Sequence, residues 1–320
     1  MIPVLDLQGA DFAEQLRRAS REIGFVAVVG HGIDQRLFDR VRGALRALFA
    51  LPDDHKAALR ITPTNYRGFI PLGFFTPNRT PSHTESTGAE GDRYEGFKLH
   101  WECPPEHPVA AECDLYGPNR WPVAMPDLEP VIAEYWAACD RAAAPMLDAF
   151  ADGLGIDRAE FRSWHDQPLT NMTLLHYPPQ PPVGDAMGIH PHKDTNVITL
   201  LHPDPVGGLE VRGRDGGWIE PDAPADALIV NVGEMLELWS GGDYVATPHR
   251  VINRSGAERY SFPFFVVPRH DITVEPLVAP QAGFDKAPMP VGALSAEVWR
   301  TNWPDQVPST AGHDLGTLDR

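Results

Sequence analysis

The sequence predicts one α+β domain in which a helical N-terminal part packs on a β-rich C-terminal core. Apolar residues recur at helical spacing in the first half, whereas short apolar or alternating runs separated by turn residues fill the second half. Many short strands at such spacing are typical of a barrel or a double-sheet jelly roll. A chain of 320 residues is long enough for one large domain or two modest ones.

Two amphipathic helices are expected near the N-terminus, with a buried strand between them. Helical spacing relates the apolar residues Phe12, Leu16, Ala19 and Ile23 in the first helix and Leu37, Val41, Leu45 and Leu48 in the second. The continuous apolar run 25–29 between them predicts the strand. Residues 60–125 are rich in proline, glycine and aromatic residues, and we expect them to form an irregular loop region of functional importance.

A long helix is expected from Asp127 to Leu154, with a kink at Pro145 because proline removes a backbone donor and crowds the preceding turn. The strands expected after it are Met172–Tyr177, Val197–His202, Gly208–Val211, Ala227–Val232 and Tyr260–Val267, with a short helix at Glu234–Trp239. We therefore divide the chain into a helical cover with substrate loops, residues 1–120, and a jelly-roll core, residues 121–320, within one structural domain.

Composition excludes several classes of partner. The net charge of −17 repels phosphate backbones and anionic lipids, so nucleic acids and membranes are not expected to bind. No apolar run is long enough to cross a bilayer, and the N-terminus lacks the pattern of a signal peptide. Cys103, Cys113 and Cys139 form no CxxC pair and predict no disulfide framework. The sequence thus predicts a cytoplasmic protein with a small-molecule ligand, and a monomer is favoured.

The tripeptide His192-Lys193-Asp194 is the clearest chemical feature of the sequence. Alternate side chains of a strand point to the same face, so His192 and Asp194 are expected to point the same way. His249, in the segment Thr-Pro-His-Arg-Val, is the candidate for a third ligand. Two imidazoles and one carboxylate on one face of an octahedral metal leave three positions free. Non-haem Fe(II) uses such positions for a co-substrate and O₂.

Two further histidines are weaker candidates for metal binding. His202 precedes Asp204 in the same tripeptide pattern, but Pro203 and Pro205 break the strand ladder there and favour a strand-end turn. His190 has the same strand parity as His192, and we interpret it as a neighbour of the ligands or a surface residue.

A candidate carboxylate site follows His249 in the sequence. Arg259 and Ser261 share one face of a predicted strand, and a guanidinium beside a hydroxyl forms a fork for a carboxylate. Near a metal, such a fork suits a dicarboxylate that chelates the metal with its other end. Tyr177 ends another strand and can donate its phenol to the same carboxylate, although an aromatic side chain at a strand end is equally often structural.

In order and spacing, these segments resemble the isopenicillin N synthase-like family of Fe(II)- and 2-oxoglutarate-dependent oxygenases. The segments that carry the resemblance span nearly the whole chain and are 2–7, 24–33, 176–179, 192–194, 207–209, 231–234, 247–251 and 259–265. The resemblance implies a double-stranded β-helix (jelly-roll) core with flanking N-terminal helices and a long central helix. It also implies iron binding by His192, Asp194 and His249. Arg259 and Ser261 would then hold the far carboxylate of 2-oxoglutarate, with Tyr177 as a helper.

The implied activity is that of a dioxygenase that uses Fe(II), 2-oxoglutarate and O₂ to oxidise a C–H bond. Hydroxylation, desaturation and oxidative cyclisation are all open outcomes, and antibiotic or other secondary-metabolite biosynthesis is the expected setting. No catalytic residue beyond the metal ligands is expected. Candidate substrate residues are the aromatic Phe74, Phe97 and Trp101, for which core packing is the alternative, and the polar Asn171, Thr173, Lys193 and Asn196. The polar members and the negative charge favour a small polar substrate, with an amine as its candidate charged group.

Three alternatives stay open at this point. An oxidase of the same fold, as isopenicillin N synthase itself is, shares the arginine–serine pair but uses no 2-oxoglutarate, so detection of succinate would separate the two. A non-catalytic jelly-roll binding protein would bind no stoichiometric iron. A hydrolytic zinc enzyme is the third, because the residue types alone permit other metals.

Overall fold

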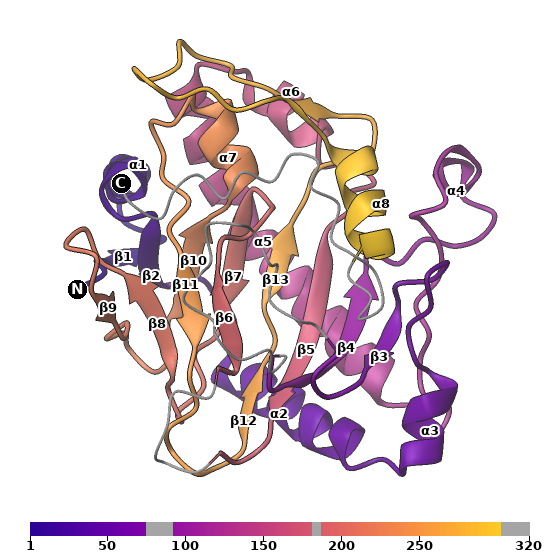
Figure 1. Cartoon of the computed structure of the whole chain (residues 1–320). Helices are drawn as coiled ribbons and strands as arrows, with labels where there is room; N and C mark the ends of the chain where they lie inside the picture. Colours follow the sequence, from indigo (N-terminus) through magenta and orange to yellow (C-terminus); the bar gives the residue numbers. More distant parts are fainter. Residues whose placement is uncertain (75–91, 181–186, 302–320) are drawn as a thin grey trace.

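Two β-sheets face each other at the centre of the computed structural model, which describes residues 1–74, 92–180 and 187–301 (Figure 1). The larger sheet, called the main sheet here, contains β1 (Val4–Asp6), β2 (Phe25–Val29), β3 (Gly68–Ile70), β4 (Glu95–His100), β5 (Asn171–Tyr177), β7 (Ile198–Leu201), β10 (Leu228–Val232), β12 (Arg259–Ser261) and β13 (Phe264–Val266). The second sheet contains β6 (Ile189–His192), β8 (Leu209–Arg212), β9 (Trp218–Ile219) and β11 (His249–Val251). A separate pair is formed by β14 (Thr273–Val274) and β15 (Met289–Pro290).

The strand order brings distant parts of the chain together in one sheet. The main sheet runs β1-β2-β10-β7-β13-β5-β4-β3, and β12 also pairs with β5. The second sheet runs β6-β11-β8-β9. Most of the neighbouring strands are antiparallel, with β1 and β2 a parallel pair. Because strands from residues 1–120 lie in the same sheet as strands from residues 121–320, the sheet joins the two predicted regions, whose division remains a prediction.

Helices pack around the main sheet, and one long helix covers its outer face. They are α1 (Phe12–Glu22), α2 (Gln35–Phe49), α3 (Asp53–Ala58), α4 (Pro108–Glu112), α5 (Leu128–Leu154), α6 (Arg158–Ser163), α7 (Glu234–Trp239) and α8 (Val291–Thr301). The long helix α5 runs behind the main sheet in Figure 1, and α1 and α2 pack on it. No helix in the described ranges has the length and apolar character needed to span a membrane.

The pairing register gives the main sheet one apolar face. Phe264 lies opposite both Met172 and Leu200 on neighbouring strands, and all three side chains are fully buried. The ring of Trp136 on α5 meets Phe264 edge-on, with ring centroids 5.0 Å apart. This face therefore forms the hydrophobic core beneath the helices.

The opposite face, called the inner face here, is largely polar. One row of register partners crosses this face from β4 to β2. In order, the row contains His100, Asn171, Phe265, Thr199, Asn231 and Phe25. Phe25 contacts His249 of the second sheet, with ring centroids 5.4 Å apart. The inner face thus looks onto the second sheet, and the two sheets form the predicted double-stranded β-helix core.

Several predicted elements are confirmed within two residues at each end. They include α1, α2, α5 and α7 and the strands β2, β5 and β10. Helix α5 is continuous through Pro145. The predicted strand Tyr260–Val267 is instead divided into β12 and β13, because Pro263 has no N–H to donate to a ladder.

The prediction of irregular structure throughout 60–125 was wrong. Strand β4 lies in this region and pairs along its whole length with β5. Its sequence, Glu-Gly-Phe-Lys-Leu-His, alternates in polarity as a half-buried strand does. Unusually, its polar residues Lys98 and His100 lie on the inner face, while Phe97 and Leu99 lie on the core face.

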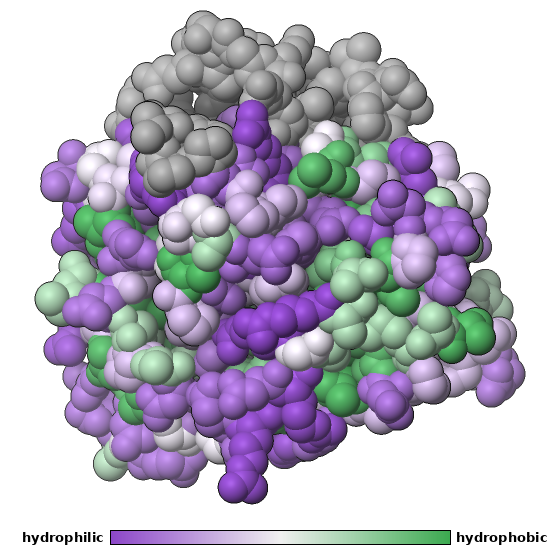
Figure 2. All heavy atoms as spheres, turned by 90° about the horizontal axis from the view of Figure 1, so that it is seen from below, coloured by the Kyte–Doolittle hydropathy of each residue, from purple (hydrophilic) through white to green (hydrophobic). Residues whose placement is uncertain are grey.

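The exposed surface carries few large apolar side chains. In the described ranges they are Met1, Val4, Leu72, Val123 and Leu277. Figure 2 shows one face of the molecule, on which hydrophilic residues dominate and apolar residues form smaller patches between them.

Gly24 permits the close approach of β2 to the segment that precedes β11. Its φ of +67° lies in the left-handed region, and a Cβ atom here would come within 2.0 Å of the Val245 carbonyl oxygen. Its own carbonyl accepts a hydrogen bond from the Val232 amide at 2.9 Å. The next residue, Phe25, is the one that contacts His249.

We expect Gly24→Ala to lower the free energy of unfolding by about 1–3 kcal/mol, because alanine is strained at this φ and meets a backbone atom. Urea unfolding followed by circular dichroism measures the change. Gly43→Ala is the matched control: Gly43 lies within α2 with open space around it, so alanine should stabilise the protein by about 0.5–1 kcal/mol. Equal effects of the two substitutions would contradict the role given to Gly24.

Candidate metal centre

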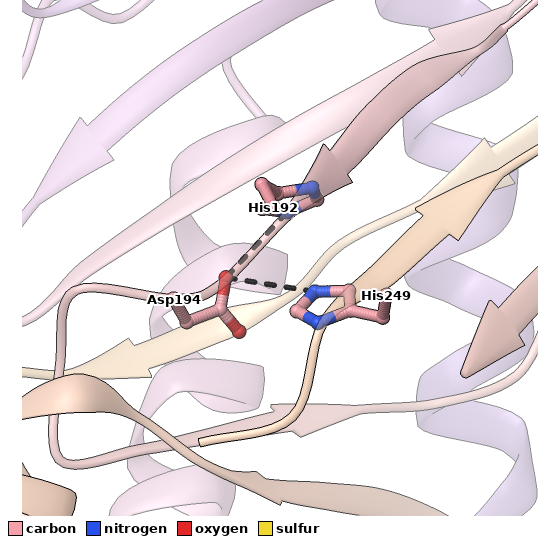
Figure 3. Close-up of side chains that lie close together, drawn as sticks. All are labelled: His192, Asp194 and His249. Carbon is pink, nitrogen blue, oxygen red and sulfur yellow. Dashed lines mark ion pairs between the residues drawn. The ribbon is translucent and has the colours of Figure 1, made fainter. Parts of the chain in front are cut away.

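His192, Asp194 and His249 converge between β6 and β11 (Figure 3). His192 is the last residue of β6, His249 is the first of β11, and the two are direct partners in the antiparallel ladder. Asp194 lies outside the strand, in the segment that follows β6. The predicted reason for its orientation, strand alternation, was therefore wrong, although the side chain does reach the two histidines.

The distances within the triad are short and similar. The Nε2 atoms of His192 and His249 each lie 3.7 Å from Oδ1 of Asp194, and the two imidazole centroids are 4.3 Å apart. Over the residues that the structure describes, this is the one group of at least three His, Cys, Asp or Glu side chains whose ligand atoms lie within 4.8 Å of one another. Two nitrogen donors and one carboxylate oxygen form a set that suits non-haem Fe(II).

Backbone carbonyls fix the tautomers of both histidines. Nδ1 of His192 lies 2.8 Å from the carbonyl oxygen of His190, and Nδ1 of His249 lies 3.2 Å from that of Thr247. A carbonyl can only accept, so Nδ1 carries the proton and donates in each case. Nε2 of each ring is left facing Asp194, as a metal ligand requires.

Two hydrogen bonds orient the carboxylate of Asp194. Its Oδ2 accepts from the Thr199 hydroxyl at 2.6 Å and from the Asn231 amide at 2.8 Å, which leaves Oδ1 for the histidines. The amide of Asn196 in turn donates to the Thr199 hydroxyl at 2.8 Å. The Asp194 carbonyl accepts from the amide of Glu234 at the start of α7, so the backbone is held as well.

Electrostatics favours the protonation states that bind a metal. Burial raises the pKa of Asp194, but the charges of His249 and His192 and the hydrogen bonds from Thr199 and Asn231 outweigh burial and hold that pKa below its ordinary value. Burial lowers the pKa of His249, and the charge of His192 lowers it further against the attraction of Asp194. An ionised carboxylate and a neutral imidazole are the ligand forms.

The other histidine candidates have different partners. His202 and Asp204 both contact Arg42, at 3.2 Å and 3.4 Å, and Phe38 stacks on the His202 ring. These contacts agree with the structural interpretation of that tripeptide. Nδ1 of His190 lies 2.6 Å from a carboxylate oxygen of Asp92, so this histidine is held by a partner outside the triad.

Arg259 and Ser261 lie on β12, beside β5. Arg259 is the ladder partner of Tyr177, and its guanidinium carbon lies 4.6 Å from the centroid of the tyrosine ring. Its Nε donates to the Gly207 carbonyl at 2.7 Å, while Nη1 is buried and has no hydrogen-bond partner among the described residues. A buried guanidinium nitrogen without an acceptor fits the binding of an anionic oxygen.

The phenol of Tyr177 is held in its donating form. Burial raises its pKa to about 12, against the opposing charge of Arg259. At neutral pH this hydroxyl keeps its proton and can donate to an anion beside Arg259.

The predicted substrate residues occupy different places. Asn171 and Thr173 lie on the inner face and accept hydrogen bonds from Lys98. Lys193 forms an ion pair with Glu237 at 3.6 Å, and Asn196 donates to Thr199 beneath Asp194. Substrate contacts of these residues remain predictions.

The aromatic candidates are largely engaged with other protein groups. Phe97 pairs with Leu174 on the core face and does not face the triad, so its predicted substrate contact does not agree with its position. Trp101 meets the rings of His107 and Tyr116 edge-on. The Arg60 guanidinium lies 5.6 Å from the ring centroid of Phe74. Core packing accounts for Phe97, while substrate contacts of the other two remain predictions.

Lys98, Thr199 and Asn231 were not predicted from the sequence. Lys98 was not placed because β4 was not recognised as a strand. Thr199 and Asn231 lie in predicted strands, but their role is to donate hydrogen bonds to Asp194. That role could not be predicted, because Asp194 lies outside the strand that was expected to orient it. The alternating polarity of residues 95–100 was the signal that could have identified β4 as a strand and placed Lys98 on one of its faces.

Known proteins share these features across the chain. Residues 169–268 match the model of the 2OG-Fe(II) oxygenase superfamily, and residues 2–124 match that of the N-terminal region described as non-haem dioxygenase in morphine synthesis. A 2-oxoglutarate-Fe(II) type oxidoreductase of Aspergillus fumigatus is 32% identical over 275 residues, which are 83% of this chain and 79% of the relative. A homoarginine-6-hydroxylase of Glycine max is 30% identical, with 83% and 80% covered.

Solved structures agree with the sequence comparisons. The crystal structure of a full-length Neurospora crassa protein in complex with alpha-KG and thymine matches with a TM-score of 0.78 and 25% identity. The match covers 93% of this chain and 96% of that one.

We expect Thr199→Val to weaken Fe(II) binding roughly 10- to 100-fold, because the isosteric side chain no longer donates to Asp194. Anaerobic Fe(II) titration measures the dissociation constant. Thr195→Val is the matched control, since the Thr195 hydroxyl donates to Glu234 instead of Asp194. Similar Fe(II) affinity in wild type and both variants would show that this hydrogen bond does not support the site.

Proposed function

The chain belongs to the 2-oxoglutarate–Fe(II) oxygenase superfamily, and on that premise we propose that His192, Asp194 and His249 hold its iron. The protein is an Fe(II)- and 2-oxoglutarate-dependent oxidoreductase, which decides against a non-catalytic binding protein. The observation that carries the assignment is the approach of both Nε2 atoms to Oδ1 of Asp194, each at 3.7 Å. The neutral imidazole of His249 and the ionised carboxylate support the same assignment.

When bound, iron, 2-oxoglutarate and O₂ supply an oxidant for a C–H bond, with conversion of 2-oxoglutarate to succinate and CO₂. The protein's own residues hold the ligand geometry. Thr199 and Asn231 keep Oδ1 of Asp194 turned towards the histidines, and the carbonyls of His190 and Thr247 keep Nδ1 protonated.

We propose that Arg259, Ser261 and Tyr177 bind the far carboxylate of 2-oxoglutarate. Support comes from the buried Nη1 of Arg259, which has no partner in the described chain, and from the protonated phenol beside it. Ser261 precedes the break at Pro263 and is the neighbour of Arg259 on the same face of β12. A planar guanidinium and two hydroxyl groups match the acceptor geometry of one carboxylate.

The organic substrate is proposed to be a small polar metabolite, as in secondary-metabolite biosynthesis. The polar inner-face residues Lys98, Asn171 and Thr173 support this class. The homoarginine in the name of one relative and the thymine bound in one similar structure agree with polar substrates. Hydroxylation, desaturation and ring closure all remain compatible with the site.

A cytoplasmic monomer is the proposed state of the protein. Cys103, Cys113 and Cys139 are all free, as in a reducing compartment. Five large apolar side chains are exposed on the described surface. A broad apolar interface between subunits contains more, so this surface supports a monomer.

We expect Arg259→Ala to raise the KM for 2-oxoglutarate at least about 30-fold, because a charge-assisted contact worth roughly 2 kcal/mol or more is lost. Succinate release under varied 2-oxoglutarate measures the effect. Arg250→Ala is the control: Arg250 pairs with Glu210 and lies over Trp218, and its loss should leave the KM within about threefold. Product formed without succinate would instead favour the oxidase alternative.

A further inference from the structure

Lys98 is a lysine inside the protein without an acidic partner. It lies on the inner face of β4, and its Nζ donates to Oδ1 of Asn171 at 2.6 Å and to the Thr173 hydroxyl at 3.0 Å. The ring of Phe265 lies beside it, with the centroid 5.3 Å from Nζ. Among the residues that the structure describes, no carboxylate lies within 4.0 Å of this nitrogen.

The other partly buried lysines form ion pairs. Lys56 lies 3.2 Å from Glu95, Lys193 lies 3.6 Å from Glu237, and Lys286 lies 2.6 Å from the same glutamate. Lys98 alone of these four has only neutral side chains as hydrogen-bond partners. An ammonium carries three N–H donors, so two partners leave one donor free.

The position of Lys98 connects it to the candidate metal centre. Its register partner Thr173 and its second partner Asn171 lie on the strand that also carries Tyr177. Across the sheet, Phe265 is the ladder partner of Thr199, whose hydroxyl donates to Asp194. Through its contacts with Asn171 and Phe265, Lys98 therefore adjoins the neighbouring residue row, which contains the Thr199 that donates to Asp194.

The surroundings of Lys98 combine dense packing with access to solvent. Burial lowers its pKa to about 7, and the charge of Asp194 only partly opposes this. The residue nevertheless keeps a part of its solvent exposure. Part of the Lys98 side chain is therefore in reach of small solutes. His100, the next residue of β4 on the same face as Lys98, packs against Trp299 of α8, with ring centroids 5.2 Å apart.

We propose that Lys98 binds an anionic oxygen of the organic substrate, a carboxylate, and so sets which end of the substrate lies at β4. This inference rests on the proposed function, since it assumes that iron and 2-oxoglutarate occupy the site described above. Lys98 has only neutral hydrogen-bond partners, so an anion that arrives with the substrate favours its protonated form and gains a charge-assisted contact. An ammonium group at the same end would be repelled, which argues against the amine favoured by the net charge of the chain.

Acetate is the probe for this carboxylate site, because it is small enough to enter any pocket that takes a larger acid. Thermal unfolding is measured without O₂, with Fe(II) and saturating 2-oxoglutarate, so that Arg259 is already occupied. Acetate is compared with acetamide and with sodium chloride at equal ionic strength. The proteins are wild type, Lys98→Met, Lys98→Arg and Lys56→Met. Lys56 is the matched control because it is a partly buried lysine of α3 that pairs with Glu95 and lies away from the inner face.

Acetate should raise the unfolding temperature of wild type and Lys56→Met more than acetamide or chloride does. Lys98→Met should bind acetate at least tenfold more weakly, and Lys98→Arg should retain binding. The inference is overturned if acetate has no specific effect on wild type, if it acts equally on all four proteins, or if Lys98→Met weakens 2-oxoglutarate binding instead. If Lys98→Met does not fold, the absence of a specific acetate effect on wild type still overturns the inference, and loss of the effect in Lys98→Arg does so as well. A wild type that 2-oxoglutarate itself fails to stabilise would count against the proposed function and not against Lys98.

Discussion

The two hydrogen bonds that the Asp194 carboxylate accepts are the interaction on which the site depends. Asp194 lies in no strand, so the ladder that aligns His192 with His249 does not orient it. Thr199 and Asn231 do so instead, from adjacent strands of the main sheet. The candidate metal centre is thus made by both sheets: the second sheet supplies the imidazoles, and the main sheet turns the carboxylate towards them.

This arrangement explains why the main sheet has two faces of opposite character. Its core face buries Met172, Leu200 and Phe264 beneath α5, where apolar burial stabilises the fold. Its inner face is polar because it supplies the hydrogen bonds to Asp194 and carries the proposed anion sites. Buried polar groups cost stability unless they are paired. Thr199 and Asn231 are paired within the protein, whereas Nη1 of Arg259 has no partner among the described residues.

Much of this could be predicted from the sequence, for identifiable reasons. Helical spacing indicated α1 and α2, and the continuous apolar run indicated β2. The order of motifs identified the triad and the Arg259–Ser261 pair. Strand alternation could not explain Asp194, because the strand ends at His192 and the turn that follows is held by tertiary contacts. Lys98 was missed because β4 lies in a region rich in proline and glycine. That composition is typical of loops, so residues 95–100 were interpreted as part of one. The kind of substrate depends on side chains from several strands and has no local pattern.

The position of β10 between β2 and β7 has a consequence for the order in which the protein is assembled on the ribosome. Asn231 belongs to β10, whose register partner on one side is Phe25 and on the other is Thr199. The nascent strand β2 must therefore wait for most of the polypeptide to emerge before it finds this partner. Contacts of such long sequence separation slow folding. Because the proposed ligand His249 lies on β11, the candidate metal centre is complete only after β10 and β11 have both been synthesised.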